Sequence, residues 1–191
     1  LDACIEQSQP LPELPHFKPD QITERIGQYV SLLVEDGATL ELGIGKIPNA
    51  VLHYLQNHKN LGVHSELITD GIIDLISKGV INNSQKTFHP GKTVTSFCLG
   101  SNTLYDFVHQ NPHVEFYPSD YVNSPVNIAR NNMMVSINSA LEVDLTGQIV
   151  SDSIGHQFYS GIGGQVDFSR GASLSKGGKP VIALPSTTED G

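Results

Sequence analysis

The chain has 191 residues, of which 38% are hydrophobic and 16% charged, and its formal net charge is −9. This length allows one α/β domain with a full core, and the composition is that of an ordinary soluble globular protein. The negative charge argues against a nucleic-acid surface, which needs clustered Lys and Arg. No apolar run approaches the ~20 residues that span a bilayer, so neither nucleic acid nor a membrane is an expected partner.

Both ends of the sequence suggest a piece of a longer protein. The start has neither an initiator Met nor the layout of a signal peptide, and the end follows a predicted strand without a closing helix. Pro10, Pro12 and Pro15 indicate a linker or an extended arm over residues 1–18. We therefore expect this arm to be followed by one domain over residues 19–191 that is truncated at its C-terminal end.

Cysteine and histidine usage predicts neither a disulfide framework nor a metal site. The two cysteines, Cys4 and Cys98, fit a reducing, cytoplasmic setting. There are eight histidines, but the pair four residues apart, His109 and His113, is interrupted by Pro112. Neither a structural nor a catalytic metal is expected.

The predicted elements begin with a helix over residues 21–35, which Asp20 is suited to cap. Its predicted buried stripe comprises Ile22, Ile26, Tyr29, Val30, Leu33 and Val34. A strand at 39–42 then runs into the turn Gly43–Gly45, where a chain with few Cβ atoms can turn sharply. Pro48 suits the first turn of the helix that follows.

A second predicted strand at 61–63 delivers His64, Ser65 and Glu66 just past its end. Ligands bind beyond the carboxyl ends of strands in open α/β sheets, so these two strand ends make a plausible site. The later predictions, in order, are a helix at 72–78, a strand at 93–99, a helix at 102–109, a strand at 114–117, an irregular turn at 118–123, a helix at 125–130, a strand at 133–139, a hairpin over 141–151, a helix at 165–174 and a strand at 180–184. This alternation predicts an α/β sandwich with an open, mostly parallel, mixed sheet flanked by helices.

A second glycine cluster, Gly161-Ile162-Gly163-Gly164, lies at a predicted junction between a strand and a helix. Free backbone N–H groups and the helix dipole make such a junction a seat for an anion. The spacing matches neither the G-x-G-x-x-G of a dinucleotide fold nor a P-loop. The alternatives are a simple tight turn, or N–H groups aimed at a phosphate or a developing oxyanion.

Glu66 is a single carboxylate, and a solvated glutamate is the ordinary interpretation of such a residue. Where a strand meets a loop and faces glycine-rich backbone, a carboxylate is also suited to attack a reactive acyl group. Glu142 and Asp144, two apart on a predicted hairpin strand and so on one face, form either a rival acidic site or surface charge. Asn123 is either a polar orienting group or a turn residue. His64 is expected to point away from Glu66, to the opposite face, and to serve packing.

Five motifs occur in order along the chain. They are G-I-G-K-I-P-N-A-V, H-S-E-L-I-T-D-G, Y-V-N-S-P, N-S-A-L-E-V-D-L-T-G-Q and G-I-G-G-Q-V-D-F-S-R-G-A. Together they resemble the acetyl-CoA hydrolase/transferase family, and the resemblance extends from about Asp20 to the end. Within that family the sequence is most similar to the 4-hydroxybutyrate and acetate/butyrate CoA-transferases.

The resemblance implies a two-domain enzyme whose halves share the CoA-transferase (NagB/RpiA-like) α/β fold, with this chain as most of the C-terminal catalytic half. It implies that Glu66 is the catalytic glutamate and that Asn123 lies beside it. The oxyanion donors it implies are the backbone N–H groups of Ile44, Gly45 and Gly164. Contacts with coenzyme A are implied for the loop residues Gly161, Gly163, Gly164, Asp167 and Phe168.

The implied reaction moves coenzyme A between an acyl-CoA, such as acetyl-CoA or 4-hydroxybutyryl-CoA, and a carboxylic acid through a covalent glutamyl-CoA thioester. It needs no metal and no tightly bound cofactor, only an oxyanion site and the exclusion of water. The expected partners are acyl-CoA, a short-chain carboxylate, the missing N-terminal half and a second copy in a homodimer. Acetyl-CoA hydrolysis and an inactive CoA-binding fragment are the alternatives, and the acyl groups exchanged stay open.

Overall fold

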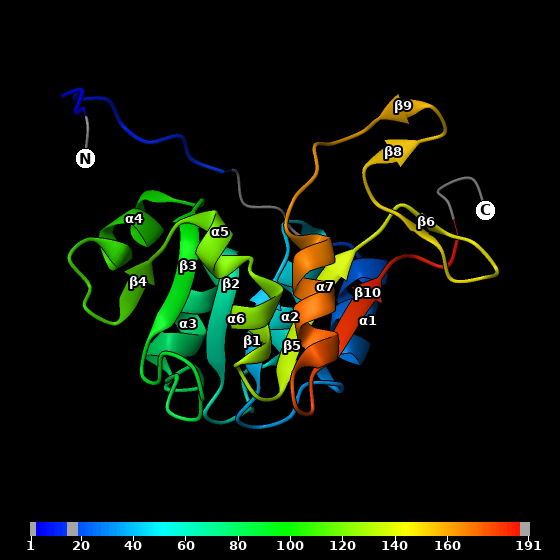
Figure 1. Cartoon of the computed structure of the whole chain (residues 1–191), viewed down its shortest axis with the longest axis horizontal. Coiled ribbons are helices and arrows are strands. Elements are labelled where there is room, and N and C mark those ends of the chain that lie inside the picture. Colours follow the sequence, from blue (N-terminus) through cyan, green and yellow to red (C-terminus); the bar gives the residue numbers. More distant parts are fainter. Residues whose placement is uncertain (1–2, 15–18, 188–191) are drawn as a thin grey trace.

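A six-stranded parallel sheet forms the centre of the molecule (Figure 1). The computed structural model describes residues 3–14 and 19–187. In the order β10-β5-β1-β2-β3-β4, each pair of neighbouring strands is parallel. The strands are β1 (Thr39–Leu42), β2 (Gly62–Ile68), β3 (Thr93–Cys98), β4 (Val114–Phe116), β5 (Met134–Ser139) and β10 (Lys179–Ala183). All their carboxyl ends therefore lie at one edge of the sheet, the edge at which open α/β sheets bind ligands.

Helices cover both faces of this sheet (Figure 1). On one face lie α1 (Gln21–Ser31), α2 (Lys46–Tyr54), α3 (Gly71–Ser77) and, near the β4 edge, α4 (Asn102–Val108). On the other lie α5 (Ser119–Val122), α6 (Pro125–Ala129) and α7 (Gln165–Leu174). The strands are thus covered from both sides, as strands of parallel sheets are. The predicted α/β sandwich is confirmed.

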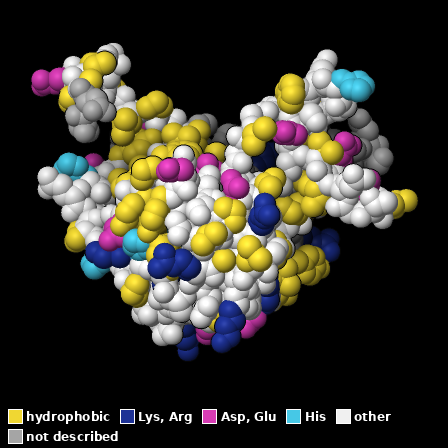
Figure 2. Space-filling view, viewed as in Figure 1, with side chains coloured by type: hydrophobic (Ala, Val, Ile, Leu, Met, Phe, Trp, Pro, Cys, Tyr) yellow, Lys and Arg dark blue, Asp and Glu magenta, His cyan; other side chains and the backbone are white. Residues whose placement is uncertain are grey.

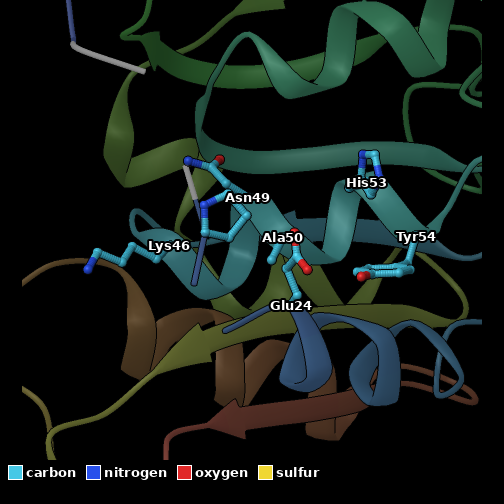
Figure 3. Close-up of a pocket in the computed structure, with 7 residues that line it drawn as sticks. Glu24, Lys46, Asn49, Ala50, His53 and Tyr54 are labelled. Atoms are coloured by element: carbon cyan, nitrogen blue, oxygen red, sulfur yellow. The ribbon is translucent and has the colours of Figure 1, made fainter. Parts of the chain in front are cut away.

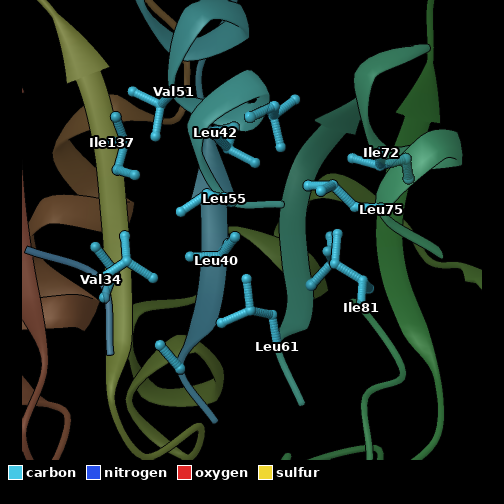
Figure 4. Packing of buried hydrophobic residues seen from close by; sticks show 14 of the residues in the cluster. Val34, Leu40, Leu42, Val51, Leu55, Leu61, Ile72, Leu75, Ile81 and Ile137 are labelled. Carbon is cyan, nitrogen blue, oxygen red and sulfur yellow. The ribbon is translucent and has the colours of Figure 1, made fainter. Parts of the chain in front are cut away.

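Two hydrophobic clusters hold these layers together. The larger one packs between α1–α4 and the sheet (Figure 4). Leu40 and Leu42 of β1 point into it, and the alternation of side chains along a strand turns Glu41 to the other face. Leu40 and Leu55 are fully buried, and burial of such a side chain stabilises the fold by ~1.5–3 kcal/mol. The smaller cluster, under α5–α7, comprises Val94, Val122, Ile128, Met134, Phe168 and Ala172.

α1 is shorter than the predicted helix, and only part of the predicted stripe is buried: Val30 and Val34 are in the core and Ile26 packs against it. It ends at Ser31, and Asp20 caps it as expected. The members of the predicted stripe that lie exposed are Ile22, Tyr29 and Leu33. The buried face also carries small residues, because a Cβ on Gly27 would lie only 2.8 Å from the Cβ of Ala50 on α2. The helical period was therefore predictable, whereas the close approach of α2, which selects the face, was not.

β2 extends through Ile68, past the predicted end at residue 63. Glu66 consequently lies inside a central strand and not in the loop after it. The strand accepts polar residues here because neighbouring backbone satisfies them: the Oγ of buried Ser65 accepts a hydrogen bond from the Leu42 N–H at 3.3 Å. The prediction ended the strand too early because it treated these polar residues as a loop signal.

Two short hairpins follow β5 outside the main sheet (Figure 1). The antiparallel pair of β6 (Glu142–Val143) and β7 (Ile149–Val150) confirms the predicted hairpin. A second pair, β8 (Ser153–Ile154) and β9 (Gln157–Phe158), is not among the predicted elements. Because these pairs form sheets of their own, the main sheet is parallel throughout and not mixed. In the space-filling view the hairpins and the arm rise on either side of a hollow along the upper edge (Figure 2).

The other predicted elements agree with the structure within about a residue, with one exception. The predicted irregular turn at 118–123 contains the short helix α5, which Pro118 precedes. Residues 3–14 contain no helix or strand, and the Leu14 N–H donates a hydrogen bond to Gly100 O at 3.1 Å beside the start of α4. The remaining predicted arm residues, 1–2 and 15–18, and the end at 188–191 lie outside the described residues. None of the helices described is both long and apolar enough to cross a membrane.

Candidate active site at the carboxyl end of the sheet

Glu66 lies on β2 with both carboxylate oxygens hydrogen-bonded. Its Oε1 accepts a hydrogen bond from Asn123 Nδ2 at 2.9 Å, and its Oε2 accepts one from the Gly164 N–H at 3.0 Å. These contacts join residues that are 57 and 98 positions apart in the sequence. Glu66 is half-buried, so its carboxylate is held in a fixed orientation while the residue keeps contact with solvent.

Asn123 reaches Glu66 because α5 packs against β2 and β3. Asn123 directly follows α5, and its backbone N–H donates to Ser119 O at 2.8 Å. The preceding Val122 is fully buried in the smaller core cluster, which anchors this end of the helix. The amide must present its NH₂ to Glu66, because a carboxylate only accepts hydrogen bonds. The predicted neighbourhood of Asn123 and Glu66 is thus realised by a helix end and not by an irregular turn.

Gly164 approaches Glu66 more closely than any residue with a side chain can. A Cβ at position 164 would lie 2.7 Å from Glu66 Oε2 and 2.8 Å from Asn123 Nδ2. Gly164 is the residue before α7, so its N–H is one of the groups at a helix start that lack a partner within the helix. The positive end of the helix dipole adds to its attraction for the carboxylate.

The rest of the predicted CoA-binding loop divides into exposed and buried parts. Gly161 and Gly163 are exposed, and a Cβ on Gly163 would lie 3.8 Å from Glu66 Oε2. Asp167 is half-buried in the first turn of α7. Phe168 is fully buried and packs in the smaller core cluster. Its side chain therefore anchors α7 to the sheet and is not available for direct contact with a ligand.

The Gly43–Gly45 turn follows β1 at the same edge of the sheet. Gly45 has a φ of 137°, in the region that favours glycine, and it precedes α2. Ile44 is exposed. The first N–H groups of α2 lack partners within the helix, as at any helix start, so the turn offers backbone donors. Within residues 19–187, no hydrogen bond joins this turn to Glu66.

His64 points to the same face as Glu66, contrary to the prediction, because side chains two apart on a strand share a face. Its Nε2 lies 2.9 Å from Val122 O, and its ring is fully buried. Burial lowers the pKa of His64 to about 4, so the ring is uncharged at neutral pH. His64 therefore serves packing, as predicted, and it lies beneath the end of α5.

Glu41 and Asn138 are site residues that the sequence analysis missed. Glu41 is 3% exposed on β1, and its Oε2 accepts a hydrogen bond from Asn138 Nδ2 at 2.8 Å. Burial raises the pKa of Glu41 to about 8, against the lowering effect of its hydrogen bonds with Ser136 and Asn138, and the negative charge of Glu66 raises it further. A signal did exist: the carboxylate stands between two apolar residues of a strand that is covered on both sides.

The rival acidic residues lie away from this site. Glu142 is exposed on β6, and Asp144 falls in the turn after β6, so the two do not form a catalytic pair on one strand face. The Asp144 carboxylate accepts hydrogen bonds from the Thr146 and Gln148 N–H groups at 2.8 and 2.9 Å, which organise the turn. Across the described ranges no group of three or more His, Cys, Asp or Glu side chains is arranged to hold a metal ion.

A cavity of about 290 Å³ lies elsewhere, between α1 and α2 (Figure 3). Its lining comprises Pro19, Glu24, Lys46, Asn49, Ala50, His53 and Tyr54. These helices cover the sheet face opposite the one that carries Glu66. The cavity and the Glu66 carboxylate thus lie on different faces of the sheet. We place the candidate active site at Glu66, because its carboxylate can act as a nucleophile and is held by two hydrogen bonds.

The chain is similar to one family model and to known CoA transferases. A model described as the acetyl-CoA hydrolase/transferase C-terminal domain matches residues 100–191. Over all 191 residues, the chain is 56% identical to the 4-hydroxybutyrate coenzyme A transferase of Clostridium kluyveri. Over the same length it is 50% identical to the succinyl-CoA:cyclohexane-1-carboxylate CoA transferase of Geobacter metallireducens.

A solved structure shows the same architecture. The 4-hydroxybutyrate CoA-transferase from Porphyromonas gingivalis superposes with a TM-score of 0.84 at 49% sequence identity, covering 96% of this chain and 43% of that one. The chain likewise covers 44% of the length of each of the two curated relatives. It therefore spans less than half of the proteins that it matches.

Proposed function

We propose that this chain is part of an enzyme of the acetyl-CoA hydrolase/transferase family, that it carries the nucleophilic glutamate of a CoA-transferase, and that this residue is Glu66. The observation that carries the proposal is the pair of hydrogen bonds that fix both oxygens of a half-buried carboxylate at the ligand-binding edge of the sheet. In this proposal residues 19–191 form the C-terminal catalytic domain, and residues 1–18 form an arm.

The proposed reaction begins when a Glu66 carboxylate oxygen attacks the thioester carbonyl of an acyl-CoA. The C–S bond breaks, CoA leaves as the thiolate, and an acyl-glutamyl anhydride remains. The thiolate then attacks the glutamyl carbonyl and displaces the first acid as its carboxylate, which leaves a glutamyl-CoA thioester. A second carboxylate reverses these steps and departs as its own CoA thioester. No net proton is gained or lost.

Asn123 and Gly164 have roles in this scheme that follow from their contacts. The Asn123 amide orients the carboxylate for attack. The Gly164 N–H lies 3.0 Å from Glu66 Oε2, so it is suited to hold the same oxygen when it becomes the oxyanion of a glutamyl tetrahedral intermediate. We propose that the N–H groups of Ile44 and Gly45 receive the second oxyanion, which develops on the acyl carbonyl.

The proposed coenzyme A contacts involve the exposed loop beside Glu66. Gly161 and Gly163 supply backbone that a ligand can approach closely, and Asp167 is a polar group one turn further on. Phe168 supports the loop from beneath through its packing in the core.

The substrates proposed are an acyl-CoA and a short-chain carboxylate, with acetyl-CoA or 4-hydroxybutyryl-CoA as the donor. CoA thioesters are the substrates named for the related enzymes. We further propose that no tightly bound cofactor takes part and that the protein acts as a homodimer. A cytoplasmic location is proposed as well, which suits the two free thiols, Cys4 and Cys98.

The test uses the complete protein as encoded in its source genome, incubated with acetyl-CoA and treated with borohydride. Borohydride reduces a glutamyl thioester to an alcohol, which peptide mass spectrometry then locates. We expect the modification at Glu66 in the wild type and its loss, together with turnover, in Glu66→Gln. Glu142→Gln is the matched control and should behave as the wild type. Turnover with an unmodified Glu66 would overturn the proposal.

Hydrolysis is the competing fate of the same intermediate, because water can replace the second acid. Release of acid from acyl-CoA only when an acceptor carboxylate is present supports transfer. Acid released at the same rate without an acceptor assigns the protein to hydrolysis. Binding of CoA with no reduced glutamate in any sample assigns it to an inactive binding role.

A further inference from the structure

A buried polar row crosses the sheet on the face that carries Glu66. Ser136 and Asn138 belong to β5, Glu41 to β1 and Glu66 to β2, which are adjacent strands. The sheet register pairs Glu41 directly with Ser136. The first three residues are buried, with Glu41 only 3% exposed. Polar groups this deep in a core are costly unless they are paired, and Asn138 is hydrogen-bonded to both Glu41 and Ser136.

The row connects Glu41 to the Gly43–Gly45 turn through a chain of contacts. Asn138 Nδ2 donates a hydrogen bond to Glu41 Oε2 at 2.8 Å. The other end of the same amide lies against Gly43: a Cβ at position 43 would be only 2.3 Å from Asn138 Oδ1. The Gly43 N–H in turn donates to Ile137 O at 2.9 Å, which ties the start of the turn to β5. The orientation of the Asn138 amide therefore limits where the turn can begin.

The charge state of Glu41 matters for its neighbour. With a pKa of about 8, Glu41 is mainly protonated at neutral pH. The other titratable group on this face of β2, His64, is uncharged under the same conditions. Glu41 and His64 therefore add no charge beside the Glu66 carboxylate at neutral pH. An uncharged Glu41 also accepts the Asn138 hydrogen bond without the cost of a buried charge.

We propose that Glu41 is a positioning residue, which holds the Asn138 amide against Gly43 and thereby fixes the turn that receives the acyl oxyanion. The inference rests on the proposed function, because it assigns the turn a part in the same reaction. It concerns a residue that does not touch the reacting atoms.

The expected signature is a loss of kcat with little change in KM. Glu41→Ala leaves the Asn138 amide without its partner, so the turn shifts and transition-state stabilisation falls. We expect kcat to drop at least ~10-fold while the KM for acyl-CoA stays within ~2-fold, since the oxyanion contact forms only in the transition state. Glu41→Gln keeps the acceptor and the volume, and should recover most of the loss.

A double-mutant cycle separates positioning from general loss of structure. Asn138→Ala should lower kcat as much as Glu41→Ala does. The double variant should lower kcat no further than either single variant, because both residues act on one chain of contacts. Thr39→Val is the matched control: Thr39 is buried on the same face of β1, two residues earlier, and should leave kcat unchanged. Wild-type kcat in Asn138→Ala, or additive losses in the double variant, would overturn the inference.

Borohydride labelling in the same samples distinguishes this inference from the proposed function. A wild type without a reduced Glu66 overturns the proposed function and the inference with it. A labelled wild type together with a Glu41→Ala variant that labels and turns over at the wild-type rate overturns the inference alone. If Glu41→Ala does not fold, Asn138→Ala and Glu41→Gln decide the outcome by the same criteria.

Discussion

At position 164 the protein backbone, and not a side chain, holds the Glu66 carboxylate. The N–H contact at 3.0 Å requires the two residues to approach so closely that no Cβ fits between them. The Asn123 contact is of a different kind, because a side-chain amide can adjust its position by rotation. The hydrogen bond from Gly164 therefore tolerates less change in the position of the Glu66 carboxylate than the one from Asn123.

Gly164→Ala is expected to reduce the rate of Glu66 labelling by ~100-fold, the cost of losing one oxyanion donor. The new Cβ would lie 2.7 Å from Glu66 Oε2 and force the carboxylate away from the N–H. The measurement is the rate at which acetyl-CoA makes Glu66 reducible by borohydride.

Gly163→Ala is the matched comparison, because its Cβ would lie 3.8 Å from the same oxygen, an ordinary contact distance. Gly163→Ala should reduce the rate of Glu66 labelling far less than Gly164→Ala does. Equal losses in the two variants would show that the loop requires flexibility and that the close approach at position 164 is not the cause.

At the scale of single residues, the sequence predicted which residues lie together better than it predicted their secondary structure. Resemblance selected Glu66 over Glu142, and the positions of Asn123 and Gly164 against the Glu66 carboxylate are compatible with it. Glu41 was overlooked although it stands between two apolar residues of a strand, because that pattern indicates a buried carboxylate only when the strand is known to be covered on both sides. The face of His64 was predicted wrongly by an error of strand geometry, which the two-residue period corrects.

Among the elements, α7 connects the core to the site. Its first turn begins at Gly164, and its middle packs on α6, where a Cβ on Gly171 would lie 2.5 Å from the Ile128 side chain. Phe168 fills the core between these points. The position of the Gly164 N–H is therefore set by packing several residues away.

Gly171→Ala is expected to destabilise the fold by ~1–3 kcal/mol and to slow Glu66 labelling, because α7 must move away from Ile128. Urea unfolding measures the first effect and borohydride labelling the second. Ser173→Ala, on the exposed side of the same helix, is the control for the substitution itself. A destabilised Gly171→Ala variant that labels at the wild-type rate would refute the link between α7 packing and the site.

Element types and order were predictable because the hydrophobic periods and the turn residues agree along most of the chain. The failures share a cause in tertiary packing. The buried face of α1 follows from the contact between Gly27 and Ala50, and the length of β2 follows from partners on β1 and β3. Neither contact has a local signal. The second hairpin was missed because two-residue strands are too short to show a period.

At the scale of the whole molecule, three buried ionisable groups among the described residues connect stability to pH. Their environments favour the neutral forms of Glu41, His64 and Lys86, with pKa values of about 8, 4 and 7. Glu41 binds its proton more tightly in the folded state, so its stabilising contribution is complete below about pH 4.5 and is lost as the pH rises through 8. His64 and Lys86 act in the opposite sense, because their folded-state pKa values are lowered.

Glu41→Gln isolates the first of these effects. Its free energy of unfolding relative to the wild type should increase by roughly 3.5 kcal/mol between pH 5 and pH 8, because glutamine has no proton to lose. Urea unfolding at the two pH values measures this difference. The free energy of unfolding of the control Thr39→Val should differ from that of the wild type by the same amount at both pH values. A Glu41→Gln offset that does not change with pH would mean that Glu41 is already ionised in the folded protein.

The lack of a side chain at Gly164 also limits how this sequence can drift over generations. A Cβ there would meet Glu66 Oε2 and Asn123 Nδ2 at once, so no larger residue can enter unless both neighbours retreat together. A shorter acid at position 66 would relieve the crowding but would withdraw the carboxylate from its place. The three positions therefore constrain one another: while Glu66 and Asn123 keep their places, only glycine fits at position 164.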